Sequence, residues 1–302
     1  QEETEQLREE VKRLTSELQE LQVRSLSPED TALLDPQLAV ANAQSMLVEC
    51  FGDQASHPLY TKICLTKDWD ERRKTLMAVR QEKLRSAYDS SCRVASARHT
   101  QSDERFVTSD GDLCCIRYET VEFPGVKSLQ QVWDALMFYV TNLEISISER
   151  LGHITVQDDY DCVDDKIYNT RVLSTNDRGL TIEGNVVTFS HLFRKGEDGL
   201  GLGGAIEEYG VLVVQSVDED EMYPYVPSER IRRDTAGAIV LTVNEPKTRK
   251  SKNRAGGEAD DVDVVVTMRR AAFFKLFYPQ FPVDEAALQE LQGGIARWGD
   301  VR

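Results

Sequence analysis

The sequence predicts an α+β fold in which a curved antiparallel sheet wraps around a C-terminal helix, behind an N-terminal segment that is helical and coiled-coil. From residue 105 onward, runs rich in β-branched and aromatic residues alternate with acidic, glycine-rich or basic turns. The chain then ends in a helical stretch, residues 282–302, with one apolar stripe. A curved sheet buries its concave face by wrapping around such a helix, and this arrangement often leaves an apolar cavity.

Composition limits the classes of function. The chain has 302 residues, of which 40% are hydrophobic, enough for one large core or two smaller ones. Its formal net charge of −16 argues against phosphate-backbone binding by the chain as a whole. No apolar run approaches the length of a membrane span and no signal-peptide pattern opens the sequence. We therefore expect an intracellular protein, with nucleus and cytoplasm both open.

The pattern changes along the chain predict three regions. Residues 1–25 form a coiled-coil (zipper) segment, residues 26–104 a helical connecting region with a linker, and residues 105–302 an α+β domain. The first 24 residues contain no Gly or Pro, and their apolar side chains recur in alternating steps of four and three. These heptad positions are Leu7, Val11, Leu14, Leu18 and Leu21. We expect them to dimerise the chain, as a homodimer or heterodimer; an amphipathic helix packed on its own domain is the alternative.

The connecting region contains two helical stretches, at residues 36–52 and 68–90, and Asp68 is a plausible cap of the second. Six basic side chains give this second helix a basic face: Arg72, Arg73, Lys74, Arg80, Lys83 and Arg85. A solvated helix, laced with Glu71 and Glu82, is favoured over nucleic-acid contact. Residues 91–104 are polar and without period, which predicts a linker.

The α+β region begins with a hairpin whose turn is Asp110-Gly111, followed by a strand over 113–123. Residues 128–152 predict the strongest helix of the chain, ended by Gly152. The remaining strands are predicted at 153–157, 166–174, 180–194, 205–217, 236–244 and 262–274. The final helix carries an apolar stripe formed by Ala287, Leu288, Leu291, Ile295 and Trp298.

Several motifs that often carry chemistry fail on context. The glycine run at 199–204 has the spacing of a dinucleotide fingerprint, but no strand precedes it and no helix follows, so we expect a loop. The acidic runs at 158–165 and 218–221 lack the pattern of a calcium loop and are interpreted as solvated turns rather than a metal site. The basic run at 246–254 is interpreted as a solvated loop rather than an import signal. We expect no cofactor and no metal.

Nothing in the sequence singles out a catalytic group. The four histidines lie in separate segments, and no nucleophile-elbow motif is present. Six cysteines show no C-x-x-C pairing, and Cys114-Cys115 should pack in the core with one thiol on each face of a strand. The segment 222–234, rich in aromatic residues and arginine, is interpreted as an ordered crossing whose arginines pair with the acidic run before it.

Three segments resemble the oomycete mating-specific protein family: "FPGVKSLQQVWDALMFYVTNLEISISERLGHITVQDD" at 123–159, "DEDEMYPYVPSERIRRD" at 218–234 and "LQELQGGIARWGDV" at 288–301. The resemblance spans most of residues 105–302, and the zipper repeat fits the same architecture. It implies an N-terminal basic-zipper-like helix and a START-like helix-grip domain of the kind that elsewhere holds lipids or other apolar molecules. It supplies no catalytic residues, and the basic region expected before the zipper is absent from these residues.

The function expected is a non-enzymatic START-like module, dimerised through its zipper helix, that binds an apolar or lipid-like ligand or a protein partner. The candidate cavity residues are Trp133, Phe189, Tyr209, Val213, Leu241, Leu288, Leu291 and Ile295. One alternative is the regulatory part of a basic-zipper transcription factor, which would bind DNA through an upstream basic region. Another is an enzyme on the same cavity, which requires at least two titratable groups inside it, whereas the strand pattern offers few inward charges.

Overall fold

The computed structural model describes residues 60–94, 101–163, 166–197, 200, 207–244 and 264–299. Its elements are, in chain order, β1 (Cys64–Leu65), α3 (Trp69–Val94), β2 (Gln101–Val107), β3 (Leu113–Val126), α4 (Leu129–Thr141), α5 (Leu143–Leu151), β4 (Ile154–Val163), β5 (Ile167–Thr175), β6 (Thr181–Phe193), β7 (Tyr209–Ser216), β8 (Glu219–Asp220), β9 (Ile231–Asn244), β10 (Val264–Leu276) and α6 (Glu285–Gly299). The predicted zipper, the helix at 36–52 and the basic run at 246–254 lie outside the described residues.

Eight strands form one twisted sheet in the order β2-β3-β10-β9-β7-β6-β5-β4, and every neighbouring pair in that order is antiparallel. The predicted hairpin is confirmed: β2 and β3 pair across a turn in which Gly111 has a φ of +87°. The six strands predicted from alternating apolar residues are confirmed as β4, β5, β6, β7, β9 and β10, with shifted ends. Strand β4 continues through residues 158–163, which corrects their interpretation as a solvated turn, and the two-residue β8 was not predicted. The predicted curved antiparallel α+β architecture is therefore the one observed.

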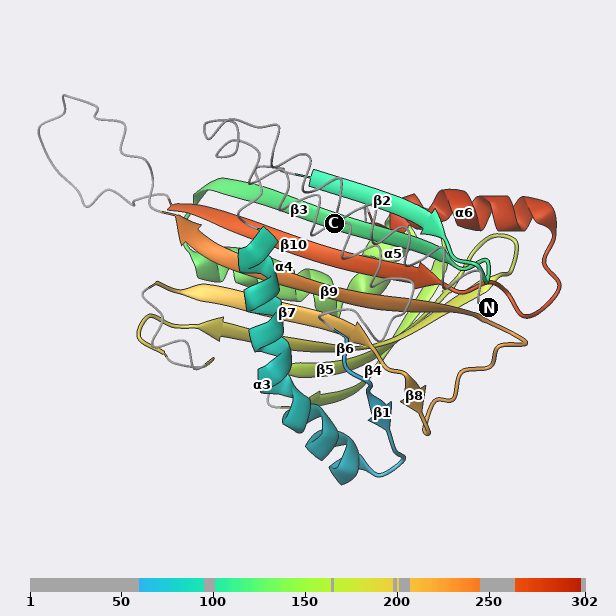
Figure 1. The fold of residues 1–302 in the computed structure, drawn as a ribbon, viewed down its shortest axis with the longest axis horizontal. Helices are drawn as coiled ribbons and strands as arrows, with labels where there is room; N and C mark the ends of the chain where they lie inside the picture. Colours follow the sequence, from blue (N-terminus) through green and yellow to red (C-terminus); the bar gives the residue numbers. More distant parts are fainter. Residues whose placement is uncertain are drawn as a thin grey trace, which may run out of the picture.

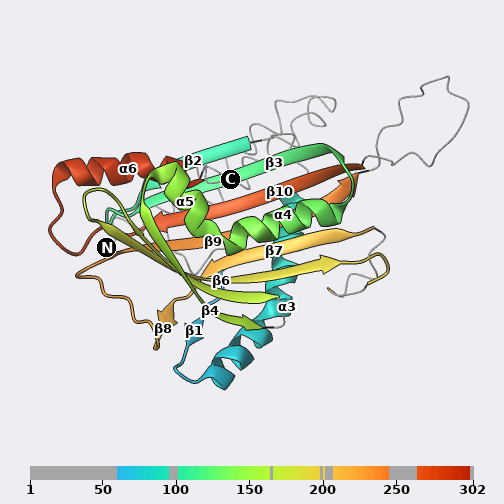
Figure 2. The same cartoon turned by 180° about the vertical axis from the view of Figure 1, so that it is seen from behind.

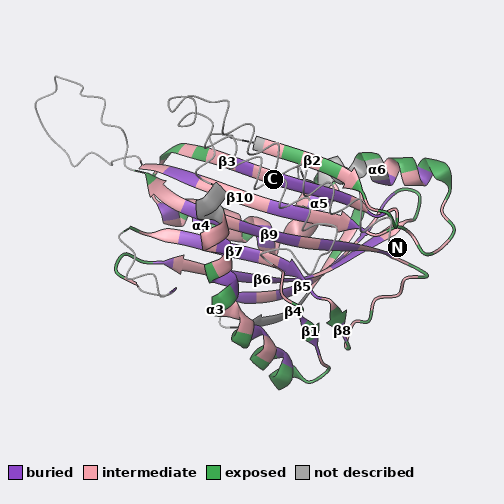
Figure 3. Cartoon of the chain, in the orientation of Figure 1, coloured by how far each residue is buried: buried purple, intermediate pink, exposed green. Residues whose placement is uncertain are grey.

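The sheet has two covered faces, because successive side chains of a strand point to opposite sides. Helix α3 crosses one face, which we call the outer face, and helices α4 and α5 lie on the other, the inner face (Figures 1 and 2). Burial is deepest where the central strands lie between these helices, whereas α3 keeps an exposed side toward solvent (Figure 3). The inner and outer faces thus hold two separate hydrophobic clusters.

Helix α3 is amphipathic, but its buried side includes charged residues as well as apolar ones. Asp68 caps it, since its carboxylate accepts a hydrogen bond from the Glu71 amide at 2.9 Å. Its buried stripe contains Leu76, Leu84 and Ala87, but also the cations Arg72 and Lys83, which are 1% and 2% exposed. The interpretation of the basic residues as a solvated face is therefore wrong for these two cations, which face the sheet.

The Arg72 guanidinium binds the Asp220 carboxylate with two contacts, of 2.8 and 3.1 Å, and also the Asn169 side-chain oxygen at 2.8 Å. Asp220 accepts a further bond from Asn185 at 2.8 Å. Because every charge in this network is paired, it can stay out of water without a large desolvation penalty. The network fixes the start of α3 to β5, β6 and β8, and Asp220 is a structural anchor rather than a solvated turn residue.

Helix α3 is also anchored to the sheet farther along its length, at Lys83. The Lys83 ammonium donates to the side-chain oxygen of Gln215 on β7, and burial lowers the pKa of Lys83 to about 8. Helix α3, which belongs to the predicted connecting region 26–104, thus packs onto the outer face of the sheet.

His191 joins α3 to the turn after β6. Its Nδ1 lies 3.1 Å from Arg80 Nη2 and its Nε2 lies 2.8 Å from Glu197 Oε1. Arginine can only donate, so Nδ1 accepts and the neutral ring donates from Nε2 to the carboxylate. Burial lowers the pKa of His191 below 6.5, and the charges of Arg80 and Lys166 act in the same direction against Glu197.

This geometry predicts a pH dependence of stability. The unfolded chain takes up the His191 proton more readily than the folded protein, so the free energy of unfolding should be full above about pH 6.5 and fall as the pH drops below it. Urea unfolding between about pH 7.5 and pH 5.5 measures this slope. His191→Gln should have a shallower slope in that window. An unchanged slope would show that His191 does not contribute.

The helix predicted over 128–152 is two helices. Ser128 caps α4, accepting from the Gln131 amide at 3.2 Å, but the helix ends at Asn142, whose φ of −132° is not helical. Gln157 of β4 holds the break, since its side chain accepts from the Leu143 amide at 3.1 Å and donates to the Thr141 carbonyl at 3.0 Å. The break lets α4 and α5 each follow the curved sheet, and Gly152 ends α5 as predicted, with a φ of +71°.

Helix α6 does not take the predicted place across the sheet. It packs at one end of the domain against β3, β10 and α5 (Figure 2). Its Leu291 and Leu288 join Ile147 of α5 and Leu276 of β10 in one hydrophobic cluster. The concave face is already covered by α4 and α5, so the expectation that the sheet wraps around the C-terminal helix is corrected.

Candidate functional site: a cavity beneath helices α4 and α5

A cavity of about 540 Å³ lies between the inner face of the sheet and helices α4 and α5. This volume falls within the range typical of small-molecule sites. Its walls are mainly aliphatic and aromatic side chains: Val121, Phe123, Val126, Val132, Leu136, Val140, Leu143, Ile147, Val186, Leu212, Val214, Ile239, Leu241, Met268 and Phe274. A sealed and fully packed interface between sheet and helices would have contradicted the ligand-binding hypothesis, and the structure does not have one here.

Small residues in the middle of the sheet leave the room that forms the cavity. Gly237 of β9 pairs with Ala272 of β10, and Ala271 lies beside them in the wall. The absence of larger side chains in the middle of the sheet leaves room under α4 that packing would otherwise fill. A side chain at Gly237 would meet the Ala271 carbonyl oxygen at 3.1 Å, so this position is also sterically restricted.

Trp133 sets the height of α4 above the sheet. The indole lies directly on Gly210 of β7, so closely that a Cβ at Gly210 would be 2.6 Å from its Cε3 atom. Leu129 and Val140 flank it in the same buried cluster, while Leu136 and Val132 project over the cavity. The helix is therefore held at its buried Trp133 and spans the open space beside it.

The cavity has a mouth at one edge of α4. Among its lining residues, Gln131 and Ala135 are exposed, and both lie on α4. The β3 residues Val121 and Phe123, which also line the cavity, are half-buried. A ligand can thus reach the interior beside α4.

The wall also carries ionisable side chains, which the sequence analysis missed. Arg233 and Glu119, 8% and 7% exposed, and the half-buried Arg270 line the cavity with Tyr139 of α4. Burial lowers the pKa of Arg233 to about 10. It also raises the pKa of Tyr139, while the charges of Arg270 and Arg233 act the other way. The expectation of few inward charges is therefore wrong.

A signal for these residues exists in the sequence. Arg269-Arg270 and Arg232-Arg233 are pairs within strands, and alternation sends one member of each pair to either face. Arg232 points to the outer side, where it donates to Asp234 at 2.7 Å, and Arg269 donates to Thr242 at 3.2 Å. Which member points inward depends on the register of the sheet, which the sequence alone does not fix.

The predicted cavity residues separate into several locations. Leu241 lines the cavity as predicted, and Trp133 anchors the helix above it. Phe189, Tyr209 and Val213 belong to the outer-face cluster under α3, which corrects their assignment. The prediction chose the wrong face because both faces of the central strands are apolar, so alternation does not reveal which one is inward.

The remaining predicted cavity residues come from α6. Leu288 and Leu291 pack in the cluster with α5, beside the cavity rather than in its wall. Ile295 lies in a part of α6 whose side chains are not described. The zipper residues Leu7, Val11, Leu14, Leu18 and Leu21 lie outside the described residues, so dimerisation through them stays a prediction.

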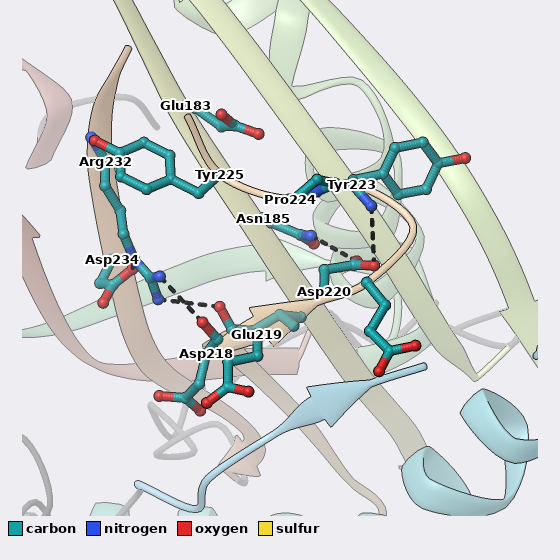
Figure 4. Close-up of a pocket in the computed structure, with 12 residues that line it drawn as sticks. Glu183, Asn185, Asp218, Glu219, Asp220, Tyr223, Pro224, Tyr225, Arg232 and Asp234 are labelled. Atoms are coloured by element: carbon teal, nitrogen blue, oxygen red, sulfur yellow. Dashed lines mark hydrogen bonds and ion pairs between the residues drawn. The ribbon is translucent and has the colours of Figure 1, made fainter. Parts of the chain in front are cut away.

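A second pocket, of about 310 Å³, lies beside β8, and most of the residues that line it have polar or charged side chains (Figure 4). Asp218 accepts from the Tyr60 hydroxyl and the Ile63 amide, each at 2.8 Å. Arg232 donates to the Asp218 and Val217 carbonyls, each at 3.1 Å. Figure 4 shows the Arg232 guanidinium pointing toward the Asp218 segment. These contacts bind the segment before α3 to the crossing between β7 and β9, which supports the predicted structural role of that crossing.

The two adjacent cysteines of β3 behave as core side chains, whereas Cys64 of β1 is exposed. Cys114 and Cys115 are both buried, in different hydrophobic clusters, as expected for neighbours in one strand. Burial raises the pKa of each thiol to about 11, which keeps both protonated at neutral pH. In the described part of the chain, no group of three or more His, Cys, Asp or Glu residues has the geometry to hold a metal ion.

Comparisons with known proteins give little beyond this geometry. No family model matches the sequence, and no curated protein matches it. Among solved structures, human STARD10 superposes with a TM-score of 0.35 and 8% sequence identity, over 73% of this chain and 76% of that chain. Within the described residues, none of the helices combines the length and apolar character that crossing a membrane requires.

Proposed function

We propose that this domain is a START-like module that binds an apolar or amphipathic small molecule in the cavity beneath α4 and α5. The observation that carries the proposal is the cavity itself: about 540 Å³ of mainly apolar space inside a folded domain, with a mouth beside α4. Side chains that line an unfilled cavity lose the van der Waals contacts that close packing would provide. A bound apolar molecule supplies those contacts. The curved antiparallel sheet with helices on its concave face supports the START-like assignment.

We further propose that binding occurs without chemical turnover. The enzyme hypothesis requires at least two titratable groups inside the cavity, and the wall contains that many. Whether they could catalyse a reaction therefore depends on how readily they exchange protons. Arg233 and Arg270 do not exchange protons readily near neutral pH, and burial raises the pKa of Tyr139. Glu119 lies directly opposite Arg270 in the β3–β10 register, so the two opposite charges are cross-strand neighbours. These groups suit recognition of charge better than acid–base catalysis.

Blocking the mouth tests the proposal. Ala135 is exposed on α4 and lines the cavity, so Ala135→Trp places an indole at the mouth without disturbing the core. We expect the purified protein to enhance the fluorescence of the neutral apolar dye Nile red, and Ala135→Trp to lose most of that enhancement. Titration of dye with each protein measures the affinity.

The matched control is Asp134→Trp, which adds the same indole at the neighbouring exposed position of α4, outside the cavity wall. It should bind Nile red as the unmodified protein does. Full binding by Ala135→Trp would place the dye elsewhere and contradict the proposal. Absence of Nile red binding to the unmodified protein would also contradict it.

A further inference from the structure

The cavity wall contains a buried hydroxyl group on β6, that of Thr188. The neighbours of Thr188 along the strand, Val187 and Phe189, pack in the hydrophobic cluster of the outer face. Because successive side chains of a strand alternate between the two faces, Thr188 points to the inner face, where it lines the cavity. The residue is 2% exposed, so its hydroxyl is kept away from bulk solvent.

The Thr188 side chain forms no hydrogen bond with any residue that the structure describes. Other hydroxyls nearby are paired: Ser190, the next inward residue of β6, donates to the Lys166 carbonyl at 3.4 Å, and Ser216 of β7 accepts from the Thr235 amide at 2.7 Å. A buried hydroxyl without a partner is unfavourable, and most buried polar groups in proteins are therefore paired. Since Thr188 adjoins the open space of the cavity, a ligand atom can supply the missing partner.

The register places Thr188 far from the mouth of the cavity. Its row across the sheet runs through Val214 of β7 and Gly237 of β9 to Ala272 of β10, and all of these residues line the cavity. The wall beside the mouth belongs to β3, which is four strands away from β6. At about 4.8 Å between neighbouring strands, the two ends are about 19 Å apart. A ligand that enters beside α4 thus reaches Thr188 at the far end.

The volume of the cavity limits the size of the ligand. A methylene group takes up about as much space as a water molecule, about 30 Å³, so about 540 Å³ holds about 18 such groups. One alkyl chain with a small polar group fits this space, whereas a lipid with two long chains exceeds it. Between the mouth and Thr188, Ile239, Leu212 and Val214 offer apolar contacts to such a chain.

We propose that the ligand is a long-chain alcohol, or another single-chain molecule with one neutral hydroxyl group. Its hydroxyl binds Thr188, and its chain extends toward the mouth beside α4. A hydroxyl both donates and accepts, as threonine does, so the hydrogen bond can form in either direction. This inference rests on the proposed function of the cavity and names the class and the orientation of its ligand.

Two matched ligands test the assignment of Thr188. The molecules 1-decanol and 1-chlorodecane share a chain, but only the alcohol can donate a hydrogen bond. Each competes with Nile red, below its solubility limit, for the unmodified protein and for Thr188→Val. Valine has nearly the shape of threonine and suits a strand, so the fold should be retained. We expect Thr188→Val to bind decanol about three- to tenfold more weakly, as the loss of one hydrogen bond implies, and chlorodecane at least as tightly as before.

Two further valine substitutions are the controls. Thr235 also lines the cavity, on β9, but its hydroxyl oxygen is covered by protein atoms, so a ligand does not reach it. Thr120 of β3 lies between Glu119 and Val121, which line the cavity, and alternation therefore turns it to the outer face. Thr235→Val and Thr120→Val should each bind decanol within about twofold of the unmodified protein.

The outcomes separate this inference from the proposed function. Unchanged decanol affinity in Thr188→Val, an equal loss for chlorodecane, or an equal loss in either control would overturn the assignment and leave apolar binding intact. Failure of decanol to displace bound Nile red would also overturn it. If neither Nile red nor either chain binds the unmodified protein, the proposed function itself fails.

Discussion

Arg72→Met should lower the free energy of unfolding by about 3–5 kcal/mol, the range for breaking a buried ion pair by removing one partner. The Arg72 and Asp220 side chains are 1% and 3% exposed, and the substitution leaves the carboxylate of Asp220 buried without its main counter-charge. Asp220 would retain its bond from Asn185 at 2.8 Å, which does not neutralise it. Urea unfolding followed by circular dichroism measures the change.

Two further variants make this prediction specific. Arg73→Met removes the same charge from the next, exposed position of α3 and should change stability by less than about 0.5 kcal/mol. Arg72→Met combined with Asp220→Asn removes the uncompensated charge and should recover part of the loss. A full-size loss in the Arg73→Met variant, or no recovery in the double variant, would contradict the role assigned to the pair.

Trp133→Ala should cost about 3–5 kcal/mol, because the indole is the largest buried side chain between α4 and the sheet. Its contact with Gly210 gives a second, sharper test. Gly210→Ala would place a methyl group 2.6 Å from Cε3 and 2.7 Å from Cζ3 of Trp133, which forces the indole and α4 outward. Overpacking of this kind costs about 1–3 kcal/mol. Chemical unfolding of each variant measures both effects.

A double-mutant cycle shows whether the two residues act through their contact. In a Trp133→Leu background, Gly210→Ala should lose most of its cost, because the smaller side chain can move aside. Gly293→Ala is the matched glycine control: no atom lies within 4 Å of its added Cβ, and alanine favours the helix. Additive effects at Trp133 and Gly210 would contradict the packing described. Trp133→Ala and Gly210→Ala should each also weaken Nile red binding, since each changes the position of α4 above the cavity.

The local elements could be predicted because their signals are local. The hairpin turn at Asp110-Gly111, the six longer strands after α5 and the end of α5 at Gly152 each follow from residue type and period. The break at Asn142 could not, because the apolar stripe runs through it without interruption. It is fixed by Gln157, a residue of the adjoining strand, through bonds to both sides of the break.

The cavity was predicted in kind but assigned to the wrong elements. An apolar sheet face does imply an apolar site, and Leu241 does line it. However, the central strands are apolar on both faces, so Phe189 and Val213 were assigned to the cavity although they pack under α3. The cations of α3 were assigned wrongly for a related reason. The sequence does not show the distant partners of Arg72 and Lys83, so both were interpreted as solvated charges although they are buried.

Most segments that become strands and helices could be predicted from the sequence, since backbone preference and side-chain period act over neighbouring residues. Tertiary structure alone decided which member of each arginine pair faces inward. It did so because a strand's face depends on register with its neighbours, and a shift of one residue exchanges the faces. Arg233 and Arg270 therefore line the cavity while Arg232 and Arg269 lie outside it. The charge of the cavity is a property of the assembled sheet.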